Sequence, residues 1–121
     1  MKAVVSISDA PPGNHGFHIH VTPDCANGGD AAGGHWDPAG TAMHGAWGDP
    51  VHHGGDIGNI LIDAGGNGST TLTTDAWSIG TGATNDVVGH AVILHASADD
   101  LMTQPTGAAG ARIACGIIQV R

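Results

Sequence analysis

Two histidines of one short segment, His18 and His20, are spaced so that both can bind the same metal ion. Side chains alternate between the two faces of a β-strand, so residues two apart point the same way. In a strand over about residues 15–21, Phe17 and Ile19 then point to the opposite, apolar side. Two imidazoles on a rigid strand form half of a transition-metal site, and imidazole suits copper and zinc. We expect the rest of the chain to supply the other half.

The other candidate ligands lie in residues 25–56 and at the end of the most apolar segment. His35, His44 and His53 follow one another at intervals of nine residues. Asp56 comes three residues after His53, and His95 closes the apolar segment. Three imidazoles with one carboxylate form a normal zinc site, whereas four imidazoles in a flattened arrangement suit copper(II). Seven residues can serve both sites if His35 is shared, and this combination favours a metal centre over scattered histidines.

The remaining histidines are interpreted as structural. His15 falls on the same strand face as Phe17, which indicates a structural role. His52 has the wrong spacing to Asp56 and is expected to be exposed in a loop, and His90 is expected to be a half-exposed strand residue. The three tryptophans are expected to pack against loops.

The hydrophobic pattern predicts about six strands and two long loops. The predicted strands are residues 3–7, 15–21, 57–62, 69–74, 87–95 and 112–120. Residues 65–68 predict a tight turn, and therefore a hairpin between the strands on either side. A structureless segment as long as residues 25–55 is unexpected in a compact domain unless a metal or a disulfide fixes it. Residues 96–111 form the second polar loop.

The composition is typical of an all-β protein, and 121 residues fit one domain, residues 1–121. All eleven acidic residues are Asp against three cations, so a net charge of -8 argues against nucleic acid and anionic membranes as partners. Without an apolar run of 18 residues or a leader, we expect neither a membrane span nor an export signal. A removed leader would indicate a periplasmic or extracellular protein, and otherwise the cytoplasm is expected.

The chain resembles the copper/zinc superoxide dismutases over nearly its whole length, through five motifs. They are Gly16–His20, Ala32–His35, His53–Asn59, Asp99–Leu101 and Gly110–Gly116. The resemblance implies a Greek-key flattened barrel or sandwich. It also implies that the family's first hairpin is absent, which leaves the first and last strands as free edges. Pairing of such edges favours a homo-oligomer, with a dimer as the simplest closed form.

The resemblance also implies a role for each candidate residue. His18, His20, His35 and His95 would bind copper, and His35, His44, His53 and Asp56 would bind zinc. Asp99 would link ligands of the two metals, and Arg112 would receive the substrate anion. A disulfide between Cys25 and Cys115 would tie the long loop to the last strand. Without a Cys-x-x-Cys motif, a structural disulfide is favoured over a reactive pair.

The implied activity is the dismutation of superoxide to dioxygen and hydrogen peroxide. Superoxide would be held beside Arg112, reduce copper(II) and leave as dioxygen. A second superoxide would reoxidise copper(I) and leave as hydrogen peroxide, with His35 detaching from copper to carry a proton. The alternative function is a non-catalytic copper- and zinc-binding module for metal buffering or delivery. Residues 99–111 contain no Lys, so long-range attraction of superoxide is expected to be weak.

Overall fold

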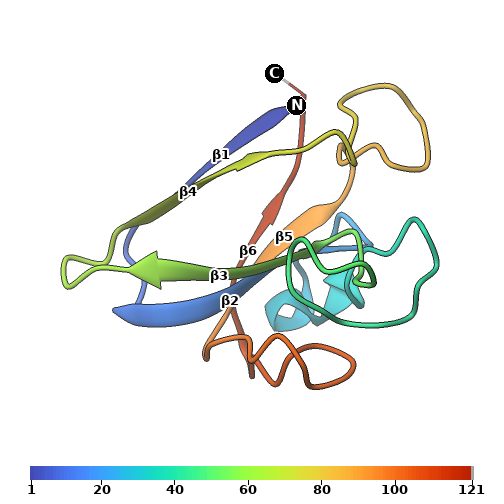
Figure 1. The fold of residues 1–121 in the computed structure, drawn as a ribbon. Helices are drawn as coiled ribbons and strands as arrows, with labels where there is room; N and C mark the ends of the chain where they lie inside the picture. Colours follow the sequence, from blue (N-terminus) through green and yellow to red (C-terminus); the bar gives the residue numbers. More distant parts are fainter. Residues whose placement is uncertain (121) are drawn as a thin grey trace.

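The computed structural model describes residues 1–120 and consists of β-strands joined by irregular loops (Figure 1). The strands are β1 (Lys2–Ile7), β2 (Gly13–His20), β3 (Asp56–Ile62), β4 (Gly68–Thr73), β5 (Ala91–His95) and β6 (Arg112–Ile117). A short 3-10 segment, η1 (Asn27–Ala32), lies between β2 and β3. The all-β class and the six strands are confirmed. In the described part of the chain, no helix is long and apolar enough to cross a membrane.

The strands form two antiparallel sheets whose inner faces share one hydrophobic core. The larger sheet has the order β3-β2-β5-β6, and the smaller one pairs β1 with β4. Phe17 and Ile19 of β2 and Ile60 of β3 are buried in the core, where Val5 and Leu72 of the smaller sheet pack against it. Figure 1 shows the loops gathered beyond the ends of the strands. The sheets therefore form a scaffold, and the loops cover the histidine-bearing face.

The predicted hairpin between residues 57–62 and 69–74 is wrong. β3 pairs with β2 and β4 pairs with β1, so the two strands belong to different sheets. The tight turn does exist, because the carboxylate of Asp63 accepts hydrogen bonds from the backbone N–H groups of Gly65 and Asn67. This turn carries the chain from one sheet to the other. Turn residues report a reversal of direction but not the partner of each strand.

The strand predicted over residues 87–95 is shorter in the structure, because its first residues form a turn. The carboxylate of Asp86 accepts hydrogen bonds from the N–H groups of Gly80, Gly82 and Val88, which fixes the turn. Consequently His90 lies just before β5 and not within a strand. It is half-buried, and its ring stacks on Trp36 with 4.7 Å between the centroids.

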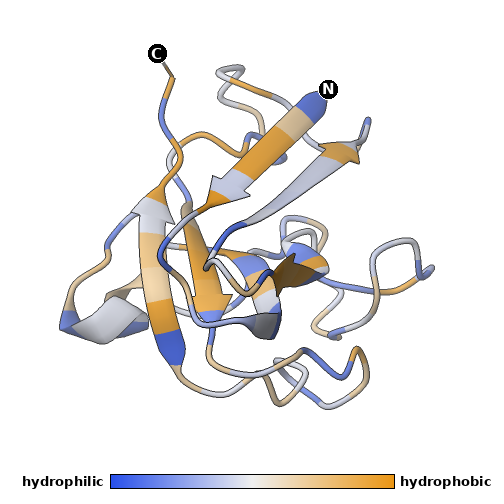
Figure 2. Ribbon diagram, turned by 90° about the vertical axis from the view of Figure 1, so that its left-hand side faces the viewer, coloured by the Kyte–Doolittle hydropathy of each residue, from blue (hydrophilic) through white to orange (hydrophobic). Residues whose placement is uncertain are grey.

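β1 and β6 each keep one unpaired edge in the part of the chain that the structure describes, as the resemblance implied. Between them lie two cavities of about 280 and 240 Å³ that reach down to the core. We call this opening the β1–β6 slot, and it is lined by Val5, Phe17, Val92, Ala114 and Ile118. Figure 2, in which the strand that starts beside the N label is mostly orange, shows the apolar character of β1.

Candidate metal centre

β2 presents its two histidines on the face opposite to the core. His18 and His20 are completely buried, while Phe17 and Ile19 lie in the hydrophobic core, as the alternation predicts. β5 lies antiparallel to β2 and ends at His95. The rings of His18 and His95 are 4.9 Å apart between centroids. Three imidazoles are thus fixed by neighbouring strands of one sheet.

His35 completes the first cluster from the long loop. It is held against β2 by an isolated bridge between His20 and His35. One potential ligand atom of each of His18, His20, His35 and His95 lies within 4.8 Å of the others. The buried atoms His18 Nδ1, His20 Nε2, His35 Nε2 and His95 Nε2 have no hydrogen-bond partner. Buried nitrogens without partners are costly, and a metal ion would satisfy all four.

The opposite ring nitrogens of this cluster are occupied. Nδ1–H of His20 donates to the carbonyl of Gly33 at 2.8 Å, and Nδ1–H of His95 donates to the carbonyl of Gly110 at 3.1 Å. Because a carbonyl oxygen only accepts, these contacts put the proton on Nδ1 and leave the lone pair of Nε2 toward the cluster. The backbone therefore sets both tautomers in favour of metal binding.

Three residues of the first cluster, His18, His20 and His95, are mainly neutral near pH 7. Burial lowers the pKa of His18 to about 4 and that of His20 to about 3, and it also lowers the pKa of His95. A histidine must be deprotonated to bind a metal, so these three side chains are ready to act as ligands.

A second cluster surrounds the carboxylate of Asp56. The Nδ1 atoms of His35, His44 and His53 lie 2.6, 3.0 and 3.2 Å from Asp56 Oδ1. The other carboxylate oxygen accepts hydrogen bonds from the N–H groups of Gly45 and His53. Burial raises the pKa of Asp56, but the hydrogen bonds from His35 and from the backbone outweigh it and hold that pKa well below its usual range. The set is three imidazoles around one charged carboxylate.

Asp99 connects the two clusters a second time. Its carboxylate lies 2.7 Å from Nε2 of His18 and 2.8 Å from Nε2 of His44. Asn59 of β3 holds the backbone of Asp99, accepting from its N–H at 2.7 Å and donating to its carbonyl at 3.0 Å. Burial raises the pKa of Asp99, but the hydrogen bonds from His18 and His44 outweigh this effect. The pKa of Asp99 therefore lies below its ordinary value. Asn59 is a residue whose role the sequence did not reveal.

Arg112 pairs with His95 across the β5–β6 ladder, which places it beside the first cluster. Its Nη1 donates to the carbonyl of Gly29 at 2.7 Å, and its Nε is 4.0 Å from a carboxylate oxygen of the exposed Asp30. The side chain is 21% exposed, so it can meet an anion arriving from solvent. The neighbouring Asp30 was not anticipated from the sequence.

The disulfide between Cys25 and Cys115 is present, with 5.8 Å between the Cα atoms. The structural role expected for His15 is confirmed. It is buried, and its ring nitrogens lie 2.8 Å from the carbonyl oxygen of His95 and 2.7 Å from that of Pro11. His52 is half-buried against the ring of Trp47 and not exposed as expected.

The three tryptophans pack as predicted. Trp36 and Trp77 are buried in the core, and Trp47 packs against it from the long loop. The indole N–H of Trp77 also donates to the carbonyl of Gly54 at 3.0 Å. These contacts hold the long loop against the sheets.

Comparison with known families identifies the family to which this fold and its histidine clusters belong. The family model described as "Copper/zinc superoxide dismutase (SODC)" matches residues 1–118. The chain belongs to this family. Its two histidine clusters, in the setting of a copper/zinc superoxide dismutase fold, indicate that it binds metal.

Two solved structures resemble the chain over almost its whole length. The clock protein EA4 is 36% identical with a TM-score of 0.84, and the match covers 99% of this chain and 80% of that one. A double mutant of a SOD-like protein from Bacillus subtilis is 33% identical with a TM-score of 0.86, covering 98% of this chain and 80% of that one. The solved structures that this chain resembles are thus described in different terms, one as a clock protein and one as a SOD-like protein.

Proposed function

We propose that the protein catalyses the dismutation of superoxide at a copper site that His35 bridges to a zinc site. The bridging position of His35 carries this proposal. Its Nε2 is buried without a partner among the nitrogens of the first cluster, while its Nδ1 lies 2.6 Å from Asp56 in the second. A single imidazole shared by a four-nitrogen set and a set with a carboxylate matches a pair of different metals.

The donor atoms support a different metal at each cluster. His18, His20, His35 and His95 form the copper set, and His35, His44, His53 and Asp56 form the zinc set. Four imidazoles suit copper, whereas three imidazoles with a carboxylate are a normal tetrahedral zinc set. When bound, copper supplies redox chemistry by alternating between two oxidation states.

The protein's own residues bind the anion and move a proton. The guanidinium of Arg112 is permanently charged and holds superoxide beside the first cluster. His35 would carry a proton on Nε2 when that nitrogen is not bound to a metal, while Nδ1 stays 2.6 Å from the carboxylate of Asp56. The overall reaction consumes two superoxide anions and two protons and yields one dioxygen and one hydrogen peroxide.

The proposal is tested with His18→Ala and His95→Ala in protein loaded with both metals. Each change removes one copper ligand and leaves the zinc set intact, so copper content and superoxide consumption should fall together while zinc is retained. His90→Gln is the matched control, because His90 belongs to neither cluster. Most of the activity surviving in either alanine variant would contradict the copper assignment. Wild-type protein that binds both metals without consuming superoxide would instead support metal buffering or delivery.

We also propose that copies of the chain associate as a homo-oligomer in which β1 or β6 takes part. Both strands keep an unpaired edge in the described chain, and the apolar β1–β6 slot lies between them. Unpaired N–H and C=O groups on such an edge favour pairing with another strand. A symmetric dimer is the simplest closed arrangement.

A further inference from the structure

His44 is a ligand of the second cluster that lies outside any helix or strand. Residues 40–46 belong to no helix or strand, and Ala42, two residues before it, has a φ of +57°. In contrast, His18, His20 and His95 lie on hydrogen-bonded strands. Something other than a strand ladder must therefore hold the backbone of His44 in place.

One side chain supplies that support. Oε1 of Gln104 accepts a hydrogen bond from the N–H of His44 at 2.6 Å, and Nε2 of Gln104 donates to the carbonyl of His44 at 2.8 Å. Nε2 also donates to the carbonyl of Met102 at 3.2 Å, which fixes the amide to its own loop. Within residues 1–120, these are the hydrogen bonds that the two backbone groups of His44 make. The amide thus pairs with His44 as a neighbouring peptide group of a strand would.

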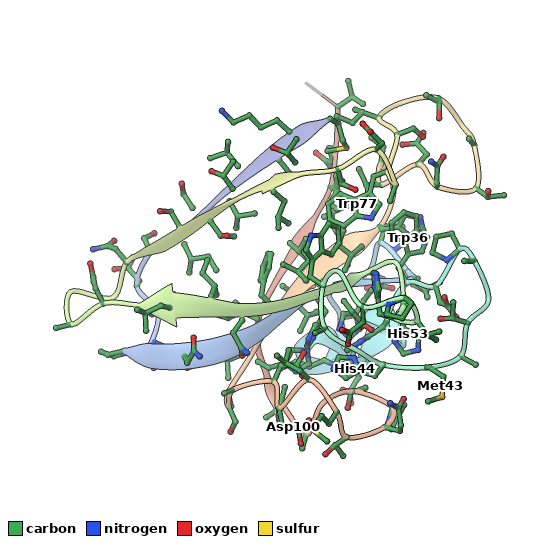
Figure 3. The ribbon with its side chains drawn as sticks, in the orientation of Figure 1. Trp36, Met43, His44, His53, Trp77 and Asp100 are labelled. Atoms are coloured by element: carbon green, nitrogen blue, oxygen red, sulfur yellow. A yellow bond between two sulfur atoms is a disulfide. The ribbon has the colours of Figure 1, made fainter. Side chains whose placement is uncertain are left out.

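The same loop also holds the ring of His44. The carboxylate of Asp99 lies 2.8 Å from Nε2 of His44. Gly107 packs so closely on this contact that a Cβ there would be 1.9 Å from Asp99 and 2.6 Å from the ring. With Nε2 and the backbone both held, Nδ1 faces Asp56 at 3.0 Å. His44, a residue of the long loop, lies against the loop that carries Asp100, as Figure 3 shows.

We propose that Gln104 is a positioning residue that sets the orientation of His44 and thereby the metal affinity of the second cluster. It acts on the backbone of the ligand, whereas Asp99 acts on its ring. The inference deepens the proposed zinc site and rests on that part of the proposed function. Partners that orient a metal ligand typically change metal affinity ten- to a hundredfold when they are removed.

The test is Co²⁺ binding at the second cluster, followed by the visible absorption of tetrahedral Co²⁺ and by competition with a chelator. Gln104→Leu keeps the bulk of the side chain and removes both hydrogen bonds, so we expect Co²⁺ affinity to fall about tenfold or more and the spectrum to change. Gln104→Glu keeps an acceptor for the N–H of His44 and loses the donor, so an intermediate loss is expected. Met102→Leu is the control, because Met102 is an exposed residue of the same loop.

A selective effect distinguishes positioning from a general loss of structure. Cu²⁺ bound at the first cluster should keep its electron paramagnetic resonance spectrum in both Gln104 variants. Unchanged Co²⁺ affinity and spectrum in Gln104→Leu would overturn the inference, as would an equal loss at both clusters in Gln104→Leu and Gln104→Glu. Wild-type protein that binds Co²⁺ as expected but lacks superoxide consumption would contradict the proposed activity alone.

Discussion

At the scale of single residues, the structure decides which nitrogen of each histidine is free to bind metal. The carbonyl groups of Gly33 and Gly110 hold Nδ1 of His20 and His95, whereas Asp99 holds Nε2 of His18. His18 therefore presents Nδ1 to the cluster, whereas His20 on the same strand presents Nε2. Sequence spacing places the rings on one face but does not identify the carbonyl groups of Gly33 and Gly110, and Asp99 was expected only from the family resemblance.

Asp30 is expected to weaken the capture of an anion by Arg112. Its exposed carboxylate lies 4.0 Å from the guanidinium and competes with an incoming anion. Asp30→Asn should raise kcat/KM for superoxide about two- to fivefold, whereas Arg112→Ala should lower it without loss of metal. Superoxide consumption by metal-loaded protein at low salt measures both effects. Asp75→Asn is the control for the change in net charge, and an equal gain there would contradict a local effect.

The buried histidines of the first cluster make the metal-free protein sensitive to acid. Their folded-state pKa values, about 4 for His18 and about 3 for His20, lie below the ordinary value of 6.5. Between these values the unfolded chain binds protons that the folded chain does not, so the stability that His18 and His20 contribute is complete above pH 6.5 and falls toward pH 4. The pKa of His44 is raised, so the stability that His44 contributes is complete below pH 6.5 and decreases only as the pH rises above that value. It therefore does not alter the acid dependence.

Urea unfolding of metal-free protein at pH 7, 5.5 and 4.5 measures this dependence. The free energy of unfolding should decrease at each step toward acid. The double variant His18→Gln, His20→Gln should show a shallower decrease over the same range, because the two titrating groups are gone. An unfolding midpoint that is constant from pH 7 to 4.5 in the unmodified sequence would be incompatible with the depressed pKa values.

At the scale of elements, the sequence is informative where a pattern is local. Alternation along residues 15–21 correctly separates the core face of β2 from its histidine face. β3 pairs with β2 and β4 pairs with β1, and both partners lie far away in the sequence. The local turn residues therefore led to the wrong hairpin. The supports supplied by Asn59 and Gln104 are also invisible in the sequence, because each joins residues 40 to 60 positions apart.

The long loop from Cys25 to Gly55 should depend on metal at the second cluster for its order. Asp56 accepts from two backbone N–H groups of this region, and His44 and His53 bring the loop to the same carboxylate. Asp56→Ala or His44→Ala should therefore make the loop more sensitive to proteases while copper remains bound. Limited proteolysis with mass-spectrometric mapping, with and without a zinc chelator, measures the change. Equal cleavage rates with and without zinc would count against this dependence.

At the scale of the whole molecule, the β1–β6 slot leads us to expect a homo-oligomer at micromolar concentration. Ala114 is an exposed residue of β6 that lines the slot, so Ala114→Lys places a charge at its mouth. Sedimentation should show an assembly for the wild type and a shift toward monomer for this variant. Ile118 suits this test poorly, because it packs against the core.

Leu61→Lys is the matched control for the assembly. Leu61 is an apolar residue of β3 that is 69% exposed and does not line the slot. Its variant should sediment as the wild type does. A soluble wild-type monomer would contradict the expected assembly, and an equal response of the Leu61 variant would place the interface elsewhere.

The Cys25–Cys115 bond closes a covalent ring whose ends are 90 residues apart in the chain. Five of the seven proposed ligands lie inside this ring, together with Asp99 and Arg112, and only His18 and His20 lie outside it. One cut in the long loop would therefore open the ring without dividing the molecule into two pieces. A nicked protein would run as one species on a non-reducing gel and as two fragments after reduction. Every ligand would stay tethered to the others, so a single cleavage would leave the centre able to reassemble as long as the disulfide is intact.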